Sequence, residues 1–298
     1  MSNARIRGVV AAVATPVQED GSPDTARATK LARFLLDNGC DGLNVLGTTG
    51  EAPALDDSEF ERVVEVTLER AGNVPVFVGL GGNATRKVVR SLELLSRYPF
   101  AGIVSVGPYY NRPGQDGLVA HFRAVAAATD RPVLIYNIPY RTAVNLSNES
   151  MLELAEVPNI AGCKDSSGSI AQSLDLLARR PGDFAVLTGE DALYFTMLAN
   201  GADGGILAAS HLLTDRFLAV RDAFARNDVE AARRAWAPLA SLVPLLFTEA
   251  NPMPIKYCLW RQGLIASPEC RLPLTRISDA LATRLDAVIA PSEGRGSR

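Results

Sequence analysis

The sequence predicts an α/β protein, a (β/α)8 barrel followed by a C-terminal helical appendage. Eight short runs rich in β-branched and apolar residues recur along the first two-thirds of the 298 residues. These runs are almost continuously hydrophobic, as are strands that are buried on both faces. Segments with helical periodicity separate them, and strands that alternate with helices form parallel sheets. Eight repeats favour the closed barrel.

The runs define the expected strands, which are 9–13, 42–46, 74–78, 102–106, 132–136, 160–163, 184–187 and 204–208. Apolar residues with helical spacing place helices between them at 24–38, 57–70, 86–97, 118–129, 148–156, 170–179 and 191–199. The alternative architecture is an open doubly wound sheet. Its dinucleotide fingerprint is missing, because Gly79-Leu-Gly-Gly-Asn83 does not have the spacing Gly-x-Gly-x-x-Gly. That segment is expected to be a strand-to-helix turn.

After the eighth run the pattern contains helices only, at 215–225, 228–247, 252–263 and 277–289. The first of these completes the barrel, so we divide the chain into a catalytic barrel, 1–227, and a C-terminal helical segment, 228–298. The polar tail 291–298 is expected to be disordered.

Composition excludes several functions. A net charge of −3 gives no reason to expect nucleic acid or an anionic membrane as a partner. The four cysteines are far apart, and only two histidines accompany them, so neither a disulfide framework, a bound metal nor a cofactor is expected. No leader or apolar run of spanning length is evident. We therefore expect a cytoplasmic protein.

Lys164 is the first candidate for chemistry. The chain has four lysines against twenty-six arginines, and Lys164 closes an apolar run. Only an amine attacks a ketone carbonyl to form a Schiff base, which arginine cannot do. Counting by twos, Tyr136 and Lys164 project inward at the same height on neighbouring strands, with Gly162 leaving room for the lysine stem. The alternative is that Lys164 merely begins a solvated loop.

Other polar residues close neighbouring strands, at the end of a barrel where active sites lie. Thr48 and Thr49 belong to a Gly-Thr-Thr-Gly turn whose N–H and hydroxyl donors suit a small carboxylate. Arg141 suits a second carboxylate, and Tyr110 and Tyr136 can pass protons. Taken singly, each has a plainer interpretation as a glycine-rich turn, a surface arginine or a structural tyrosine.

Together these residues resemble the dihydrodipicolinate synthase / N-acetylneuraminate lyase family of class I pyruvate-dependent aldolases. The resemblance covers nearly the whole chain. Its motifs are Gly47-Thr-Thr-Gly-Glu51, Pro108-Tyr-Tyr-Asn-Arg-Pro113, Tyr136-Asn-Ile-Pro139 with Arg141, Lys164, Gly189-Glu-Asp-Ala192 and Asn251-Pro-Met-Pro-Ile-Lys256.

The resemblance implies a chemistry and an assembly. Lys164 forms the Schiff base with pyruvate, and Tyr136 shuttles protons through Thr48. Tyr110 reaches in from a neighbouring subunit to complete the relay, in a homotetramer built from two tight dimers. The enamine then attacks an aldehyde.

The resemblance also implies binding roles. Thr49, with Thr48, holds the pyruvate carboxylate. Arg141 binds the carboxylate of the aldehyde, and Gly189 and Ile206 line the site near the lysine.

Two substrates stay open. Arg141 and the Tyr109-Tyr110 pair resemble enzymes that condense pyruvate with aspartate semialdehyde to 4-hydroxy-tetrahydrodipicolinate, in lysine biosynthesis. Lys164-Asp-Ser-Ser-Gly168 is more typical of catabolic aldolases or dehydratases acting on 2-keto-3-deoxy sugar acids or 4-hydroxy-2-oxoglutarate. Tyr140 stands where the synthases usually have a small residue, and it narrows the expected mouth of the site. A third hypothesis, a barrel that only senses a keto acid, predicts the loss of a catalytic residue, and none is lost.

Regulation by lysine is not expected. Asp57, Phe60 and Lys87 occupy positions where lysine-inhibited members of the family carry two histidines and a glutamate. Lys87 places a positive charge where an ammonium group must bind.

Overall fold

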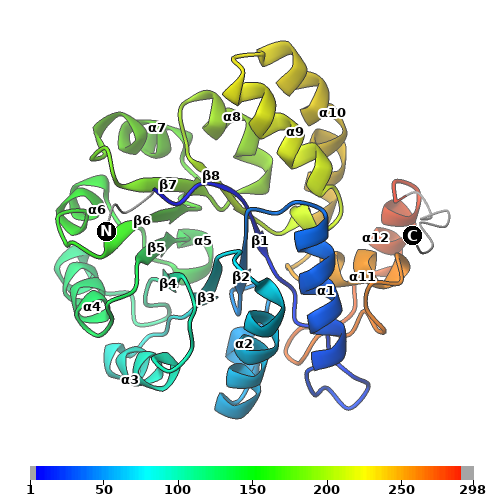
Figure 1. The fold of residues 1–298 in the computed structure, drawn as a ribbon, viewed down its shortest axis with the longest axis horizontal. Coiled ribbons are helices and arrows are strands. Elements are labelled where there is room, and N and C mark those ends of the chain that lie inside the picture. The colour runs from blue at the N-terminus through cyan, green and yellow to red at the C-terminus, as the bar shows by residue number, and fades with distance from the viewer. Residues whose placement is uncertain (1–4, 290–298) are drawn as a thin grey trace.

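The computed structural model describes residues 5–289 and confirms the predicted barrel. Eight parallel strands pair in sequence order, and β1 pairs with β8 to close the sheet. Figure 1 shows the strands at the centre with helices around them. The strands are β1 (Gly8–Ala12), β2 (Gly42–Val45), β3 (Val76–Gly79), β4 (Gly102–Val106), β5 (Val133–Asn137), β6 (Ile160–Asp165), β7 (Ala185–Thr188) and β8 (Gly204–Leu207).

Helices connect each strand to the next. They are α1 (Thr25–Asp37), α2 (Asp57–Ala71), α3 (Thr85–Leu95), α4 (Gln115–Ala127), α5 (Pro139–Thr142), α6 (Asn148–Leu154), α7 (Ile170–Arg179) and α8 (Tyr194–Ala199), with the 3-10 turns η1 (Ala52–Ala54), η2 (Asp191–Leu193) and η3 (Ala209–His211). The predicted start of α2 is confirmed: Asp56 and Glu59 form a reciprocal capping box.

Three local predictions need correction. The sixth strand does not end at Cys163 but continues to Asp165, because Asn137 on β5 pairs with it. The helix expected at 191–199 begins instead with the 3-10 turn η2. The turn α5 was not predicted at all, although Pro139 stands at its first position, where proline is well tolerated.

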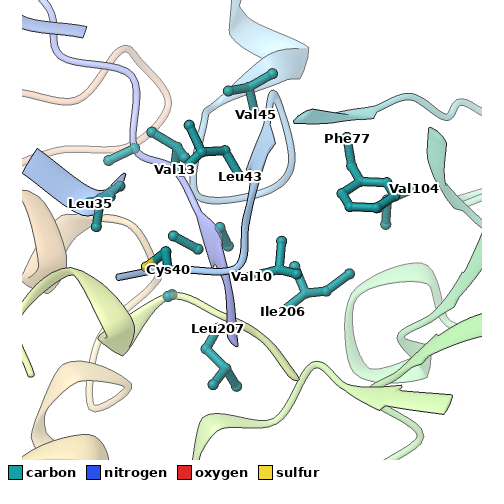
Figure 2. Close-up of a cluster of buried hydrophobic side chains, with 14 of the residues drawn as sticks. Val10, Val13, Leu35, Cys40, Leu43, Val45, Phe77, Val104, Ile206 and Leu207 are labelled. Atoms are coloured by element: carbon teal, nitrogen blue, oxygen red, sulfur yellow. The ribbon is translucent and has the colours of Figure 1, made fainter. Parts of the chain in front are cut away.

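The apolar core has one part inside the barrel and another between the strands and the helices. Figure 2 shows Val10 beside Ile206, and Phe77 beside Val104, within the barrel. Cys163 is fully buried in the outer layer, as expected for the neighbour of an inward-facing residue. These two layers fix the strands and hence the positions of the residues at their ends.

The chain after β8 is helical, as α9 (Thr214–Ala225), α10 (Val229–Leu246), α11 (Met253–Arg261) and α12 (Asp279–Asp286). Figure 1 shows α9 and α10 side by side and α11 and α12 beyond them, near the C-terminus. The division at residue 227 stays a prediction, and the predicted tail 291–298 lies outside the described residues. Within 5–289, no helix is both long and apolar enough to cross a membrane.

Candidate active site

Lys164 lies inside the barrel wall, next to Tyr136. The two residues are paired in register on β6 and β5, as the sequence predicted. The amine Nζ lies 4.2 Å from the centroid of the Tyr136 ring. Both side chains are buried, with Lys164 6% exposed and Tyr136 7% exposed. The amine therefore faces an aromatic surface with little access to water.

Burial changes the acid–base properties of this amine. Desolvation disfavours the charged ammonium and lowers the pKa of Lys164 to about 8, with Arg141 acting in the same direction. The carboxylates of Asp191 and Glu190 oppose the shift. A pKa of about 8 leaves a useful fraction of the amine neutral near pH 7. Lys164 can then act as a nucleophile.

The space for the lysine stem comes from Gly189, which corrects the sequence interpretation of Gly162. A Cβ on Gly162 would lie 2.2 Å from the carbonyl oxygen of Ala185 on β7, so that glycine permits strand contact. A Cβ on Gly189 would lie 2.7 Å from Cε of Lys164 and 2.4 Å from Oγ of Ser166. Gly189 was predicted to line the site, and the structure places it against the side chain of Lys164.

Three polar residues beside Lys164 received no role from the sequence. Burial raises the pKa of Asp191 to about 7, although backbone N–H groups at Ala209 and Ala208 oppose this. Burial also raises the pKa of Glu190. Ser166 is fully buried. The predicted barrel places the ends of β6 and β7 next to each other, but no local pattern indicated that these three side chains lie beside Lys164.

A cavity of about 500 Å³ opens at the carboxyl end of the barrel. Its lining includes Thr48, Tyr136 and Arg141, so three of the predicted site residues share one space. Thr49 lies behind the surface, 3% exposed, and its Oγ1 accepts a hydrogen bond from Asn251 at 2.9 Å. The structure thus brings a hydroxyl-bearing turn, a phenol and a guanidinium group to one opening.

Arg141 and Tyr140 lie together on α5 at this opening. The guanidinium carbon of Arg141 is 5.6 Å from the centroid of the Tyr140 ring, a cation–π distance. Tyr140 is 63% exposed, so much of its ring faces solvent. A cation held at the mouth of an apolar-walled cavity suits an anionic ligand.

Five predicted residues do not line this cavity: Lys164, Thr49, Gly189, Tyr110 and Ile206. Tyr110 is 88% exposed with a φ of 76°, and the cavity lining does not include it. Its service to a neighbouring subunit stays a prediction. Ile206 is 1% exposed and packs in the barrel core beside Val10 (Figure 2).

The fold and site define a (β/α)8 enzyme with a buried lysine at the carboxyl end of its barrel. Residues 5–291 match the model of the "Dihydrodipicolinate synthetase family". The chain belongs to this family, whose members are pyruvate-dependent lyases that use pyruvate and an aldehyde.

Individual proteins that resemble this chain carry the name of the same family of synthases. A 4-hydroxy-tetrahydrodipicolinate synthase 2 from Clostridium acetobutylicum is 43% identical over 95% of this chain and 99% of its own. The crystal structure of dihydrodipicolinate synthase from Aquifex aeolicus is 37% identical, with a TM-score of 0.92, over 95% of this chain and 97% of that one. The crystal structure of the chloride-inhibited dihydrodipicolinate synthase from Acinetobacter baumannii, complexed with pyruvate, is 33% identical, with a TM-score of 0.92. The match covers 95% of this chain and 97% of that one.

Proposed function

We propose that the protein condenses pyruvate with L-aspartate semialdehyde to 4-hydroxy-tetrahydrodipicolinate, through a Schiff base on Lys164. This proposal rests on one observation, which is that the Lys164 amine is buried against an aromatic ring. Lys164 is 6% exposed, its Nζ lies against the Tyr136 ring, and burial lowers its pKa to about 8. An amine held in this way suits attack on a ketone.

The chemistry begins when the neutral Nζ adds to the keto carbon of pyruvate. Loss of water leaves a C=N bond, and loss of a methyl proton converts this Schiff base into an enamine. The enamine carbon forms a C–C bond to the aldehyde carbon, whose oxygen gains a proton. The amino group of the semialdehyde then displaces Nζ and closes the ring. Tyr136 is our candidate for the proton transfers, relayed through Thr48 and Tyr110.

Two anionic ends of the substrates need partners. We assign the pyruvate carboxylate to Thr48 and Thr49, because a hydroxyl-bearing turn supplies several hydrogen-bond donors. We assign the carboxylate of the semialdehyde to Arg141, which lines the same cavity as Thr48 and can bind it in a bidentate manner. The structure of the Acinetobacter relative is described as complexed with pyruvate, which supports pyruvate as the first substrate.

Reductive trapping tests the mechanism. The protein is incubated with pyruvate and borohydride, and the modified peptide is identified by mass spectrometry. We expect a reduced pyruvate adduct on Lys164 and none on Lys256, which is also buried and serves as the internal control. Absence of the Lys164 adduct would exclude the Schiff-base mechanism.

The second substrate needs its own assay. Turnover of pyruvate with aspartate semialdehyde is compared with turnover of a panel of 2-keto-3-deoxy sugar acids and 4-hydroxy-2-oxoglutarate. Asp165, Ser166 and Ser167 favour the catabolic alternative, since they follow Lys164 in a pattern typical of such enzymes. Activity with the semialdehyde is expected to dominate; inactivity with it would establish the alternative.

We further propose that lysine does not inhibit the enzyme. Asp57 and Phe60 line the cavity. By the family resemblance, Lys87 adds a cation where an ammonium group would have to bind. Turnover is expected to stay unchanged at millimolar lysine, since like charges repel each other. A clear fall in turnover would refute this.

A homotetramer in which Tyr110 serves the adjoining site is the remaining proposal. Tyr110→Phe and Lys164→Arg subunits, each expected to be inactive alone, are co-expressed with different tags, and the mixed assembly is purified. If Tyr110 acts across an interface, one site of each mixed pair carries neither change, and activity returns. Failure of the mixture to recover activity would place Tyr110 outside the neighbouring site.

A further inference from the structure

The turn that carries Thr48 and Thr49 has a demanding backbone. Leu46 and Glu51, on either side of it, have φ values of 58° and 54°, which non-glycine residues seldom adopt. Gly50 is required, because a Cβ there would lie 2.8 Å from the backbone nitrogen of Leu46. Backbone in such a conformation persists only when surrounding contacts hold it. One such contact is local to the barrel, where Thr15 donates its hydroxyl proton to the carbonyl oxygen of Gly50 over 2.8 Å; others come from the other end of the chain.

Glu51 is held by two residues of the C-terminal segment. Nζ of Lys256, on α11, donates to Oε1 of Glu51 over 2.6 Å, and the backbone N–H of Arg271 donates to Oε2 over 2.8 Å. The side chains of Lys256 and Glu51 are 0% and 3% exposed, so solvent and salt screen this ion pair little. Both carboxylate oxygens at the end of the turn are thereby fixed.

Arg271 also holds the chain just beyond the turn. Its guanidinium donates to the carbonyl oxygen of Ala54 over 2.6 Å and to both carboxylate oxygens of Glu59 on α2. Such a two-pronged pair fixes direction as well as distance. The segment from Glu51 to the start of α2 is thus attached to a loop that follows α11.

Asn251 acts on Thr49 itself. Its side-chain Nδ2 donates to Oγ1 of Thr49 over 2.9 Å, and both residues are buried. A threonine hydroxyl has a single proton. Because its oxygen accepts from Asn251, Thr49 is left to donate that proton to another acceptor, such as a carboxylate. Asn251 therefore sets the direction in which Thr49 can donate.

We propose that Asn251, Lys256 and Arg271 are positioning residues for the pyruvate carboxylate, acting through Thr49 and Glu51. The C-terminal segment is then part of the substrate-binding device of the barrel. This inference rests on the proposed function in one respect, the binding of the pyruvate carboxylate by the Thr48-Thr49 turn.

The test measures pyruvate binding separately from folding and from the second substrate. The full-length protein is titrated with pyruvate in the presence of borohydride, and the fraction of Lys164 modified is read by mass spectrometry. The variants are Asn251→Ala and the double change Glu51→Gln with Lys256→Met, which removes both charges and keeps the volumes. We expect the half-saturating pyruvate concentration to rise about tenfold in each, the effect of one lost oriented hydrogen bond. The plateau of modified Lys164 is expected to stay near that of the wild type.

Asp203→Asn is the matched control. Asp203 pairs with Arg180 in another buried ion pair, with side chains 4% and 8% exposed, but at the amino end of β8. This variant is expected to lower the melting temperature and leave half-saturation unchanged. An equal rise in half-saturation in Asp203→Asn would overturn the proposal, because general loosening of the barrel would then explain the effect. Unchanged half-saturation in Asn251→Ala and in the double variant would also overturn it.

Arg271→Lys covers the case in which a buried variant fails to fold. The Arg271 side chain is 22% exposed, and lysine keeps the charge but loses the two-pronged contact. We expect a rise of about threefold in half-saturating pyruvate, and none would contradict a positioning role. If the wild-type protein forms no adduct at all, the proposed Schiff-base function fails; if it forms one and no variant changes the titration, only the positioning role fails.

Discussion

Lys164 and Lys256 are both buried near the carboxyl end of the barrel, 6% and 0% exposed, but their surroundings are opposite. Nζ of Lys256 has the carboxylate of Glu51 at 2.6 Å. Nζ of Lys164 has the face of the Tyr136 ring at 4.2 Å, and among the ion pairs within residues 5–289 it takes part in none. The same side chain thus occurs once with a charged partner and once without.

Burial alone therefore does not make a lysine reactive in this protein. Without a close counter-charge, desolvation acts against the ammonium and lowers the pKa of Lys164 to about 8, so the amine can attack a carbonyl. With Glu51 beside it, the Lys256 amine is engaged in an ion pair and holds the end of the Thr48-Thr49 turn. The partner decides which buried lysine is available for chemistry.

The largest effect is expected from Lys164→Arg. Arginine keeps the positive charge but cannot form a Schiff base, so turnover should fall by about 10⁴-fold or more, as for loss of a catalytic nucleophile. The steady-state rate is measured, and circular dichroism confirms that the barrel remains folded. Activity within tenfold of the wild type would mean that another amine attacks the substrate. Lys164 would then not differ from Lys256 in the way we propose.

Lys256→Met should act on folding and leave the nucleophile in place. It leaves the buried carboxylate of Glu51 without a counter-charge, and breaking a buried pair in this way costs about 3–5 kcal/mol of unfolding free energy. Adding Glu51→Gln should recover most of that loss, because no unpaired charge is then buried. Urea denaturation measures both variants. A single variant as stable as the wild type, or a double variant that recovers nothing, would show that the pair has little energetic weight.

Sequence periodicity was sufficient for the barrel and for the placing of Lys164 beside Tyr136. Alternation along a strand fixes which residues share a face, and the two residues are paired in register. The role inferred for Gly162 was wrong for another reason: a Cβ there would meet the carbonyl oxygen of Ala185 on β7. A count along one strand does not report how closely the neighbouring strand approaches.

Contacts between distant segments could not be predicted from the sequence. Gly189 was expected near Lys164 from the family resemblance, but only the assembled barrel shows that its missing side chain leaves room for the lysine stem. Asn251 bonds to Thr49 across 202 residues. Short-range patterns report the face of a strand or helix, whereas these contacts depend on how the C-terminal helices pack on the barrel. A residue's role in binding therefore could not be predicted where, as for Asn251, its contact lies on a distant element of the chain.

Lys164→Met should stabilise the protein, unlike the same change at Lys256. The folded-state pKa of Lys164, about 8, lies below its ordinary value of 10.5, so folding disfavours the protonated amine. At pH 7, below both values, the cost is fully present, and its removal should raise the free energy of unfolding by about 3 kcal/mol. Between pH 8 and 10.5 the unfolded state binds more protons, so wild-type stability rises and the gap should narrow. Denaturant titrations at pH 7 and 10 test this; a gap that widens with pH would contradict it.

The smallest effect concerns the rate at which pyruvate reacts with Lys164. Only the neutral amine attacks, so with a pKa of about 8 the rate should rise about tenfold between pH 7 and 9 and then level off. The rate is measured by rapid quenching into borohydride at a fixed pyruvate concentration, followed by mass spectrometry. Lys256 is expected to stay unmodified at every pH. A midpoint above pH 10 would mean that Lys164 behaves as a solvated lysine, and its burial beside Tyr136 would then give no reason to expect it, rather than Lys256, to be the nucleophile.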